Sequence, residues 1–105
     1  IDGDFDRKTF NQLIINTTGV TLEASTENTS WNPKYVQAVD KAAGYWTVEI
    51  SIDWESIGFT GAPASGRRIG FNLMRNRPRK TEEYLQWCPT RTDARRPHLF
   101  GQLAF

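Results

Sequence analysis

The sequence predicts an all-β protein whose short antiparallel strands form a sandwich or a barrel. Runs of apolar and β-branched residues recur along the chain, and turn sequences that contain glycine or proline separate many of them. The 105 residues are 38% hydrophobic and 24% charged, which is typical of one soluble domain with one core. We therefore expect residues 1–105 to form a single domain.

The first four strands are expected at residues 10–16, 20–24, 35–39 and 45–54. The turn sequences Thr-Thr-Gly and Ala-Ala-Gly separate the first from the second and the third from the fourth. The segment YWTVEISIDW alternates most clearly, because Trp46, Val48, Ile50 and Ile52 all fall on one of its faces. We expect this apolar set to face the core.

One short helical turn is expected after the fourth strand. Asp53 is placed to cap a turn from Trp54 to Ile57, and Gly58 follows as a stop signal. A turn of this length is stable only when it packs against other elements. The loop Gly-Ala-Pro-Ala-Ser-Gly at residues 61–66 comes next.

The last three strands are expected at residues 68–76, 83–88 and 101–105. Alternation turns Phe71, Leu73, Leu85 and Trp87 toward the core. The connection Arg-Pro-Arg-Lys at residues 77–80 joins the first two of these strands. We interpret its basic side chains, Arg79 and Lys80 among them, as a solvated rim at the tip of a loop.

The composition excludes several classes of protein. No apolar run approaches the roughly 18 residues of a membrane-spanning helix, and the first residues lack the pattern of a signal peptide. The single cysteine, Cys88, cannot form an internal disulfide, so we interpret it as a small buried hydrophobe. Residues 61–105 are basic, but the isoelectric point near 8.1 is below the value above about 9 that nucleic-acid-binding domains show. We predict neither a membrane nor a nucleic acid as partner.

No arrangement of residues typical of catalysis is visible, and no enzymatic activity is predicted. Hydrolysis of a glycoside needs two carboxylates across a cleft, but Glu49 has no matching partner, and Glu82 and Glu83 point to opposite sides. The single histidine, His98, follows Arg-Pro, and no nucleophile motif accompanies it.

No cofactor and no metal site are predicted. Asp2, Asp4 and Asp6 imitate the start of a calcium loop. Leu13 stands at the twelfth position of such a loop, where a bidentate glutamate is required, so an EF-hand is excluded. A structural calcium site of another kind, built from oxygen ligands, stays open as an alternative.

A set of short motifs, taken in order, resembles a known family. The motifs are NQLIINTTG, WNP, YWTVEISIDWESIGF, GRRIGFNLMRNR, EYLQWCPT and RRPHLFGQLAF. In this order they resemble the C-terminal portion of family 9 carbohydrate-binding modules, and the match spans essentially the whole chain. The resemblance implies a jelly-roll or immunoglobulin-like antiparallel β-sandwich that is secreted or displayed at the cell surface. It also implies an accessory domain of a glycoside hydrolase that binds a polysaccharide or an oligosaccharide.

The resemblance implies that strands are missing from this chain. Family members begin with several strands before the matching region, so Ile1 and Asp2 are interpreted as the end of a strand. A sandwich without those strands exposes open edges and half of its core. We therefore expect the missing strands, or a neighbouring chain that exchanges a strand, as a partner.

The sugar site of the best-described family members cannot be made here in its familiar form. Those members hold the sugar between two tryptophans, and the position of the second is Ala94 in this sequence, while a polar position after Gly-Phe-Asn is Met74. Trp31 is the tryptophan expected to be exposed, whereas Trp46 and Trp87 are expected in the core. Sugar recognition uses aromatic rings and polar side chains. The candidate carbohydrate-binding residues are therefore Gln12, Trp31, Asn72, Asn76, Arg77, Tyr84, Gln86 and Arg91.

Two alternatives to a sugar site stay open. The outward polar residues have the pattern of any solvated face of an antiparallel sheet. The whole domain is also compatible with a structural or assembly module, a β-sandwich completed by strand exchange or by a partner chain.

Overall fold

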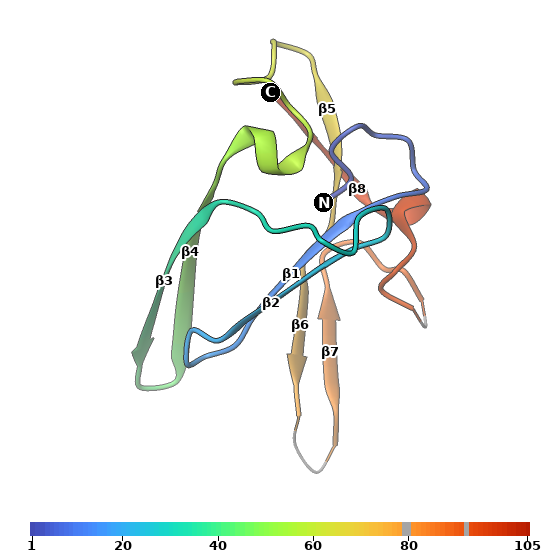
Figure 1. Cartoon of the computed structure of the whole chain (residues 1–105). Helices are drawn as coiled ribbons and strands as arrows, with labels where there is room; N and C mark the ends of the chain where they lie inside the picture. The colour runs from blue at the N-terminus through green and yellow to red at the C-terminus, as the bar shows by residue number, and fades with distance from the viewer. Residues whose placement is uncertain (79–80, 92) are drawn as a thin grey trace.

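A computed structural model describes residues 1–78, 81–91 and 93–105. These residues form β-strands, all of them antiparallel, and two short 3-10 helices (Figure 1). In chain order the elements are β1 (Asn11–Ile15), β2 (Thr21–Ser25), β3 (Tyr35–Ala42), β4 (Tyr45–Ile52), η1 (Trp54–Ile57), β5 (Arg68–Phe71), β6 (Met74–Arg77), β7 (Glu83–Gln86), η2 (Pro97–Leu99) and β8 (Gly101–Ala104). The all-β antiparallel prediction is confirmed.

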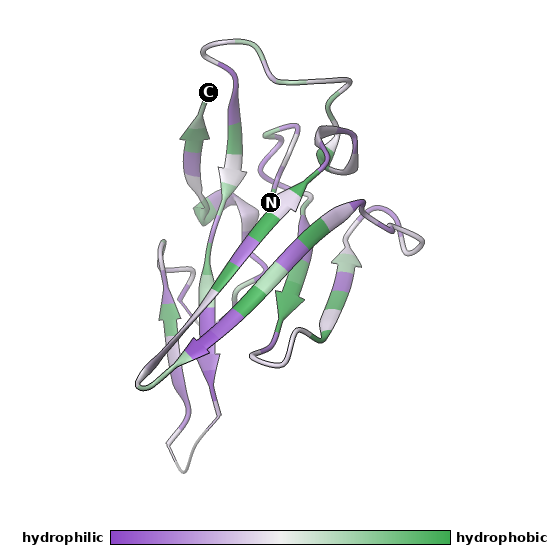
Figure 2. Ribbon diagram, turned by 90° about the vertical axis from the view of Figure 1, so that its left-hand side faces the viewer, coloured by the Kyte–Doolittle hydropathy of each residue, from purple (hydrophilic) through white to green (hydrophobic). Residues whose placement is uncertain are grey.

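The strands form the antiparallel pairs β1–β2, β3–β4, β5–β8 and β6–β7. Hydrophilic and hydrophobic residues follow one another along several of these strands, as the bands of colour in Figure 2 show. Side chains tie the first pair to the second. The Tyr35 hydroxyl donates to Glu23 Oε1 at 2.6 Å, and the Gln37 amide donates to the Gly19 carbonyl at 2.7 Å.

Ile1 and Asp2 lie between β1 and β5. Ile1 and Asn11 exchange two hydrogen bonds of 2.7 Å each. Asp2 and Gly70 exchange two bonds of 2.8 Å in an antiparallel bridge. These two residues therefore join the β1–β2 and β5–β8 pairs into one hydrogen-bonded array.

The expected helical turn is confirmed as η1, and Gly58 ends it at φ 92°, a left-handed conformation that glycine adopts without strain. The role expected for the Asp53 side chain is wrong, because within the described residues it makes no capping hydrogen bond. Its carbonyl instead accepts the Ser56 N–H at 2.9 Å. The second helix, η2, begins within the Arg-Pro sequence at residues 96–97, which is typical of a turn. None of the described helices is long and apolar enough to cross a lipid bilayer.

The single strand expected at residues 68–76 is wrong, because the chain changes partner within it. β5 pairs with β8, whereas β6 pairs with β7. Asn72 stands at the change: its amide donates to the Cys88 carbonyl at 2.9 Å, and its side-chain oxygen accepts the Cys88 N–H at 2.9 Å. The Asn72 side chain thus takes the place of a pair of backbone hydrogen bonds.

The buried core is small and lies near Ile57, Ile69 and Phe100. Phe10 packs edge-on against Phe100, with ring centroids 5.8 Å apart. In the apolar row of β4, Trp46, Val48 and Ile52 are half-buried, but Ile50 is exposed, so the core expected on this face is only partly formed.

The burial expected for three side chains of the β6–β7 region is wrong. Leu73, Leu85 and Trp87 are 61%, 50% and 52% exposed. The register does place them on one face, as alternation predicts. They are exposed because Phe71 and Gly101 of the β5–β8 pair cover only part of that face, at the Trp87 ring. The closed sandwich therefore stays a prediction.

Candidate functional site

Four side chains of the β6–β7 hairpin point to the same side. The register sets Met74 opposite Gln86 and Asn76 opposite Tyr84, and residues opposite one another share a face. We call these four residues the hairpin face. Asn76 and Tyr84 are exposed, and the Tyr84 ring is the aromatic member of the set.

Tyr84 and Glu82 form an exposed polar pair beside the hairpin face. The Tyr84 hydroxyl donates to Glu82 Oε2 at 2.9 Å. This hydrogen bond to the carboxylate, with its negative charge, raises the pKa of Tyr84. A carboxylate has room for further donors, such as hydroxyl groups. Glu82 was missed as a candidate, although its even spacing from Tyr84 predicts the same side of the strand.

Gln86 and Asn72 use their polar groups within the protein. Gln86 Oε1 accepts both the N–H and the hydroxyl of Thr90, at 2.7 and 2.9 Å. Gln86 Nε2 lies 3.5 Å from Met74 Sδ. Asn72 is bonded to the backbone of Cys88, as described above. These two candidates therefore hold the β7 end of the hairpin in place.

Arg77 lies on the other side of the hairpin from the hairpin face. It stands opposite Glu83 in the register, and Arg77 Nη1 is 3.6 Å from Glu83 Oε2. Both side chains are exposed, and such pairs contribute about 0 to 1 kcal/mol to stability. The structure does not bring Arg77 together with Asn76 and Tyr84.

The three remaining candidates lie on other elements. Gln12 is half-buried on β1, opposite Ala24. Trp31 is half-buried, not exposed as expected, and its indole N–H donates to the Ser56 carbonyl of η1 at 2.8 Å, so it anchors the loop before β3. Arg91 is exposed in the loop after β7, at φ 64°. Among the described residues these side chains form no common pocket with the hairpin face.

The opposite side of the hairpin carries an apolar face, which we define as Leu73, Leu85 and Trp87. The Trp87 ring is tilted by 59° to that of Phe71, with centroids 5.9 Å apart. Arg79 and Lys80, the predicted solvated rim at the tip, lie outside the described residues.

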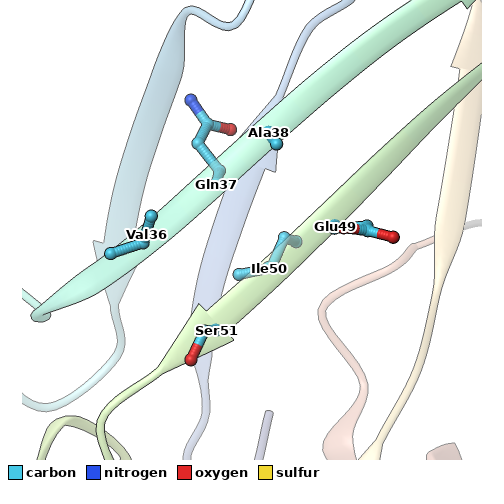
Figure 3. Close-up of a pocket in the computed structure, with 6 residues that line it drawn as sticks. All are labelled: Val36, Gln37, Ala38, Glu49, Ile50 and Ser51. Carbon is cyan, nitrogen blue, oxygen red and sulfur yellow. The ribbon is translucent and has the colours of Figure 1, made fainter.

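A shallow hollow of about 330 Å³ lies on the β3–β4 hairpin (Figure 3). Its lining comes equally from the two strands and consists of Val36, Gln37, Ala38, Glu49, Ile50 and Ser51. Tyr45 is a large exposed aromatic residue at the start of β4. The hollow is thus lined by apolar side chains together with one amide, one carboxylate and one hydroxyl group.

Asp2, Asp4 and Asp6 place carboxylate oxygens within 4.8 Å of one another. Asp2 is buried, and its two oxygens accept the backbone N–H groups of Asp6 and Arg7 at 3.2 and 3.0 Å. Burial raises the pKa of Asp2, and the hydrogen bond from the Arg7 N–H opposes this effect. Asp6 accepts the N–H groups of Lys8 and Thr9, and these bonds lower its pKa. The cluster shapes the loop between residues 2 and 9 through these internal bonds.

Comparison with known proteins bears on the function. The model of the family described as carbohydrate family 9 binding domain-like matches residues 4–105, nearly the whole chain. No curated protein and no solved structure matches the chain.

Proposed function

Because the chain belongs to the carbohydrate family 9 binding domain-like family, we propose that it is a non-catalytic carbohydrate-binding module. Its expected ligand is a polysaccharide or an oligosaccharide. Its expected setting is a secreted or surface-displayed enzyme that degrades polysaccharides. The match of the family to residues 4–105 supports this proposal.

We place the binding surface on the hairpin face together with Glu82. The observation that carries this choice is the exposed ring of Tyr84, 53% accessible, with the Asn76 amide and the Glu82 carboxylate beside it. An aromatic ring packs against the apolar side of a sugar, while amide and carboxylate groups bond to its hydroxyl groups. Gln86 supports the surface by holding the turn at Thr90.

Affinity electrophoresis and calorimetry against common soluble plant polysaccharides would test the proposal. The expected result is binding to at least one of them. Substitution of Tyr84→Ala should weaken this binding about tenfold or more, which corresponds to about 1.4 kcal/mol. Little loss of stability is expected, because the ring is exposed.

Tyr45→Ala is the matched control for Tyr84→Ala. Tyr45 is 65% exposed on β4, on a different hairpin. Its substitution should leave polysaccharide binding unchanged. Equal binding by the Tyr84 variant and the unsubstituted chain would reject the hairpin face as the site.

A second candidate function, a structural or assembly module completed by strand exchange or by a partner chain, has its own support. Large apolar side chains are exposed on several hairpins, among them Val36 and the apolar face of Leu73, Leu85 and Trp87. Contiguous exposed apolar groups are typical of surfaces that contact other protein.

Sedimentation velocity over an about hundredfold range of concentration tests this second function, because assembly depends on mass action. Concentration-dependent assembly that Leu85→Glu abolishes would favour it. A monomer at every concentration, with polysaccharide bound, would favour the carbohydrate-binding function instead.

A further inference from the structure

Two residues of the hairpin face present apolar surface to water. The Tyr84 ring is 53% exposed, and Met74 is 42% exposed. Met74 stands opposite Gln86, and Asn76 stands opposite Tyr84, so Met74 and Tyr84 are diagonal neighbours. Diagonal neighbours in an antiparallel pair lie about 7 to 8 Å apart. One sugar ring cannot cover both side chains at this separation, whereas two joined rings can.

The Met74 side chain is held in place, although methionine is a flexible residue. Gln86 Nε2 lies 3.5 Å from Met74 Sδ. Gln86 is fixed in turn, because its Oε1 accepts the N–H and the hydroxyl of the fully buried Thr90, at 2.7 and 2.9 Å. A buried threonine thus positions an exposed methionine through one glutamine. A side chain that is ordered before binding loses less conformational entropy when a ligand arrives.

Polar groups flank this pair of apolar side chains. Asn76 is exposed beside Tyr84, and Glu82 accepts the Tyr84 hydroxyl at 2.9 Å. The line from Met74, at the start of β6, to Tyr84, near the start of β7, crosses the hairpin obliquely and leaves it over the outer edges of the two strands. Strands of a sheet lie side by side in one layer. A further strand at either edge would therefore widen this surface and would not wall it off.

We propose that the hairpin face binds two adjacent sugar units of one polysaccharide molecule, with one unit over the Tyr84 ring and the next over the Met74 side chain. The ligand is then an interior segment of the polysaccharide, whose two ends continue past the outer edges of β6 and β7. This proposal rests on the proposed carbohydrate-binding function and adds which part of the ligand is recognised.

The chemistry of a polysaccharide fits this arrangement. A pyranose ring has a face of C–H groups, which packs against an aromatic ring or against a thioether side chain. The hydroxyl groups at the ring edge bond to the Asn76 amide, which donates and accepts, and to the Glu82 carboxylate, which accepts. Every unit of the polysaccharide carries these groups, so its terminal unit has no advantage. Met74 thus supplies binding surface at the position where the family resemblance implies a polar group.

The number of protein copies bound to each polysaccharide molecule tests this interior mode of binding. The probes are hydroxyethylcellulose, soluble arabinoxylan and glucomannan, each in a short and a long fraction, and sedimentation velocity measures the bound copies. For a polysaccharide that binds, the number of copies per molecule should rise in proportion to its length. A single copy per molecule at every length would overturn the proposal, because a site for a chain end behaves in that way.

Chemical reduction of the ligand is a second test, because borohydride opens only the sugar ring at the reducing end. Hexasaccharides prepared from the same three polysaccharides are compared by calorimetry before and after reduction. Reduction should change the dissociation constant by less than about twofold, because the other rings stay intact. A loss of affinity of about tenfold or more would assign the site to the chain end and overturn the proposal.

Substitutions of Met74 test the second contact. Met74→Leu keeps an apolar side chain of similar volume and should bind the hexasaccharide within about twofold of the unsubstituted chain. Met74→Asn removes the apolar surface and should weaken binding about fivefold or more, with the midpoint of unfolding unchanged. Arg75→Ala is the control, because Arg75 lies on the other side of the hairpin, and it should bind normally. Equal binding by Met74→Leu and Met74→Asn would overturn the contact.

The outcomes separate this proposal from the function on which it rests. If none of the polysaccharides is bound, the carbohydrate-binding function is rejected, and the interior mode with it. If a polysaccharide is bound, but as a single copy per molecule or with loss of affinity on reduction, only the interior mode is rejected.

Discussion

β5 and β6 come from one stretch of sequence with one pattern of alternation, yet their environments differ. Ile69 of β5 is 3% exposed, and β5 is paired on one edge with β8 and on the other with Asp2. β6 is paired only with β7 among the described residues, and Met74, Arg75 and Asn76 are exposed. Alternation therefore decides which side chains share a face, while the number of covering elements decides which face is buried.

The largest difference in stability between the β5 and β6 regions is expected when one apolar side chain is truncated in each region. Ile69→Ala should lower the free energy of unfolding by about 3 kcal/mol, because it removes buried methyl groups and leaves a cavity. Leu85→Ala on the apolar face should cost less than about 1 kcal/mol, because Leu85 is half exposed to water. Urea unfolding followed by tryptophan fluorescence measures both, and equal losses would contradict the contrast.

A pH effect of nearly the same size is expected where β5 and β1 meet. In a chain that starts at Ile1, the Ile1 amine has a pKa near 8.0 when unfolded and about 6 when folded, so the unfolded chain binds more protons between these values. Stability should therefore rise as the pH increases from about 6 to 8, by about 2 to 3 kcal/mol in total. Urea unfolding at several pH values measures this. Acetylation of the Ile1 amine should remove this rise in stability. If the rise persists after acetylation, another titrating group causes it.

A substitution of Asn72, which lies between β5 and β6, should have a smaller effect on stability. Asn72→Ala removes both side-chain bonds to the Cys88 backbone and leaves a part-buried N–H and C=O without these partners. The expected loss of stability is about 1 to 2 kcal/mol. Asn76→Ala, two residues past the start of β6, is the matched control and should change stability by less than about 0.5 kcal/mol. Similar losses for the two variants would show that Asn72 does not fix the change of partner.

The smallest effect is expected for the ion pair on β6–β7. Glu83→Gln should change the free energy of unfolding by less than about 0.5 kcal/mol, because both partners are exposed and water screens them. Unfolding in low and high salt, with and without the substitution, measures the contribution. A loss above about 1 kcal/mol would mean that the hairpin is covered in solution.

Strand alternation alone could not predict most of the candidate site, because it gives no information about contacts between distant segments of the chain. Asn76 and Tyr84 share a face as the strand period predicts. Asn72 and Gln86 were chosen on the same ground, but their side chains bond to Cys88 and Thr90, because the loop after β7 folds back on the strand ends. Trp31 was chosen as an exposed ring, and a contact with Ser56, 25 positions later in the chain, anchors it.

The local sequence by itself determined the strands other than the break between β5 and β6, the short turn at η1 and the faces that residues share. These features depend on backbone conformation and on spacing along the chain, which neighbouring residues control. Only the tertiary structure decided that β5 and β8 pair, that Asn72 ends one pairing and begins another, and that the apolar face of Leu73, Leu85 and Trp87 is half exposed. Such features depend on contacts between distant segments, and a strand pattern of period two is the same whether or not a partner is present.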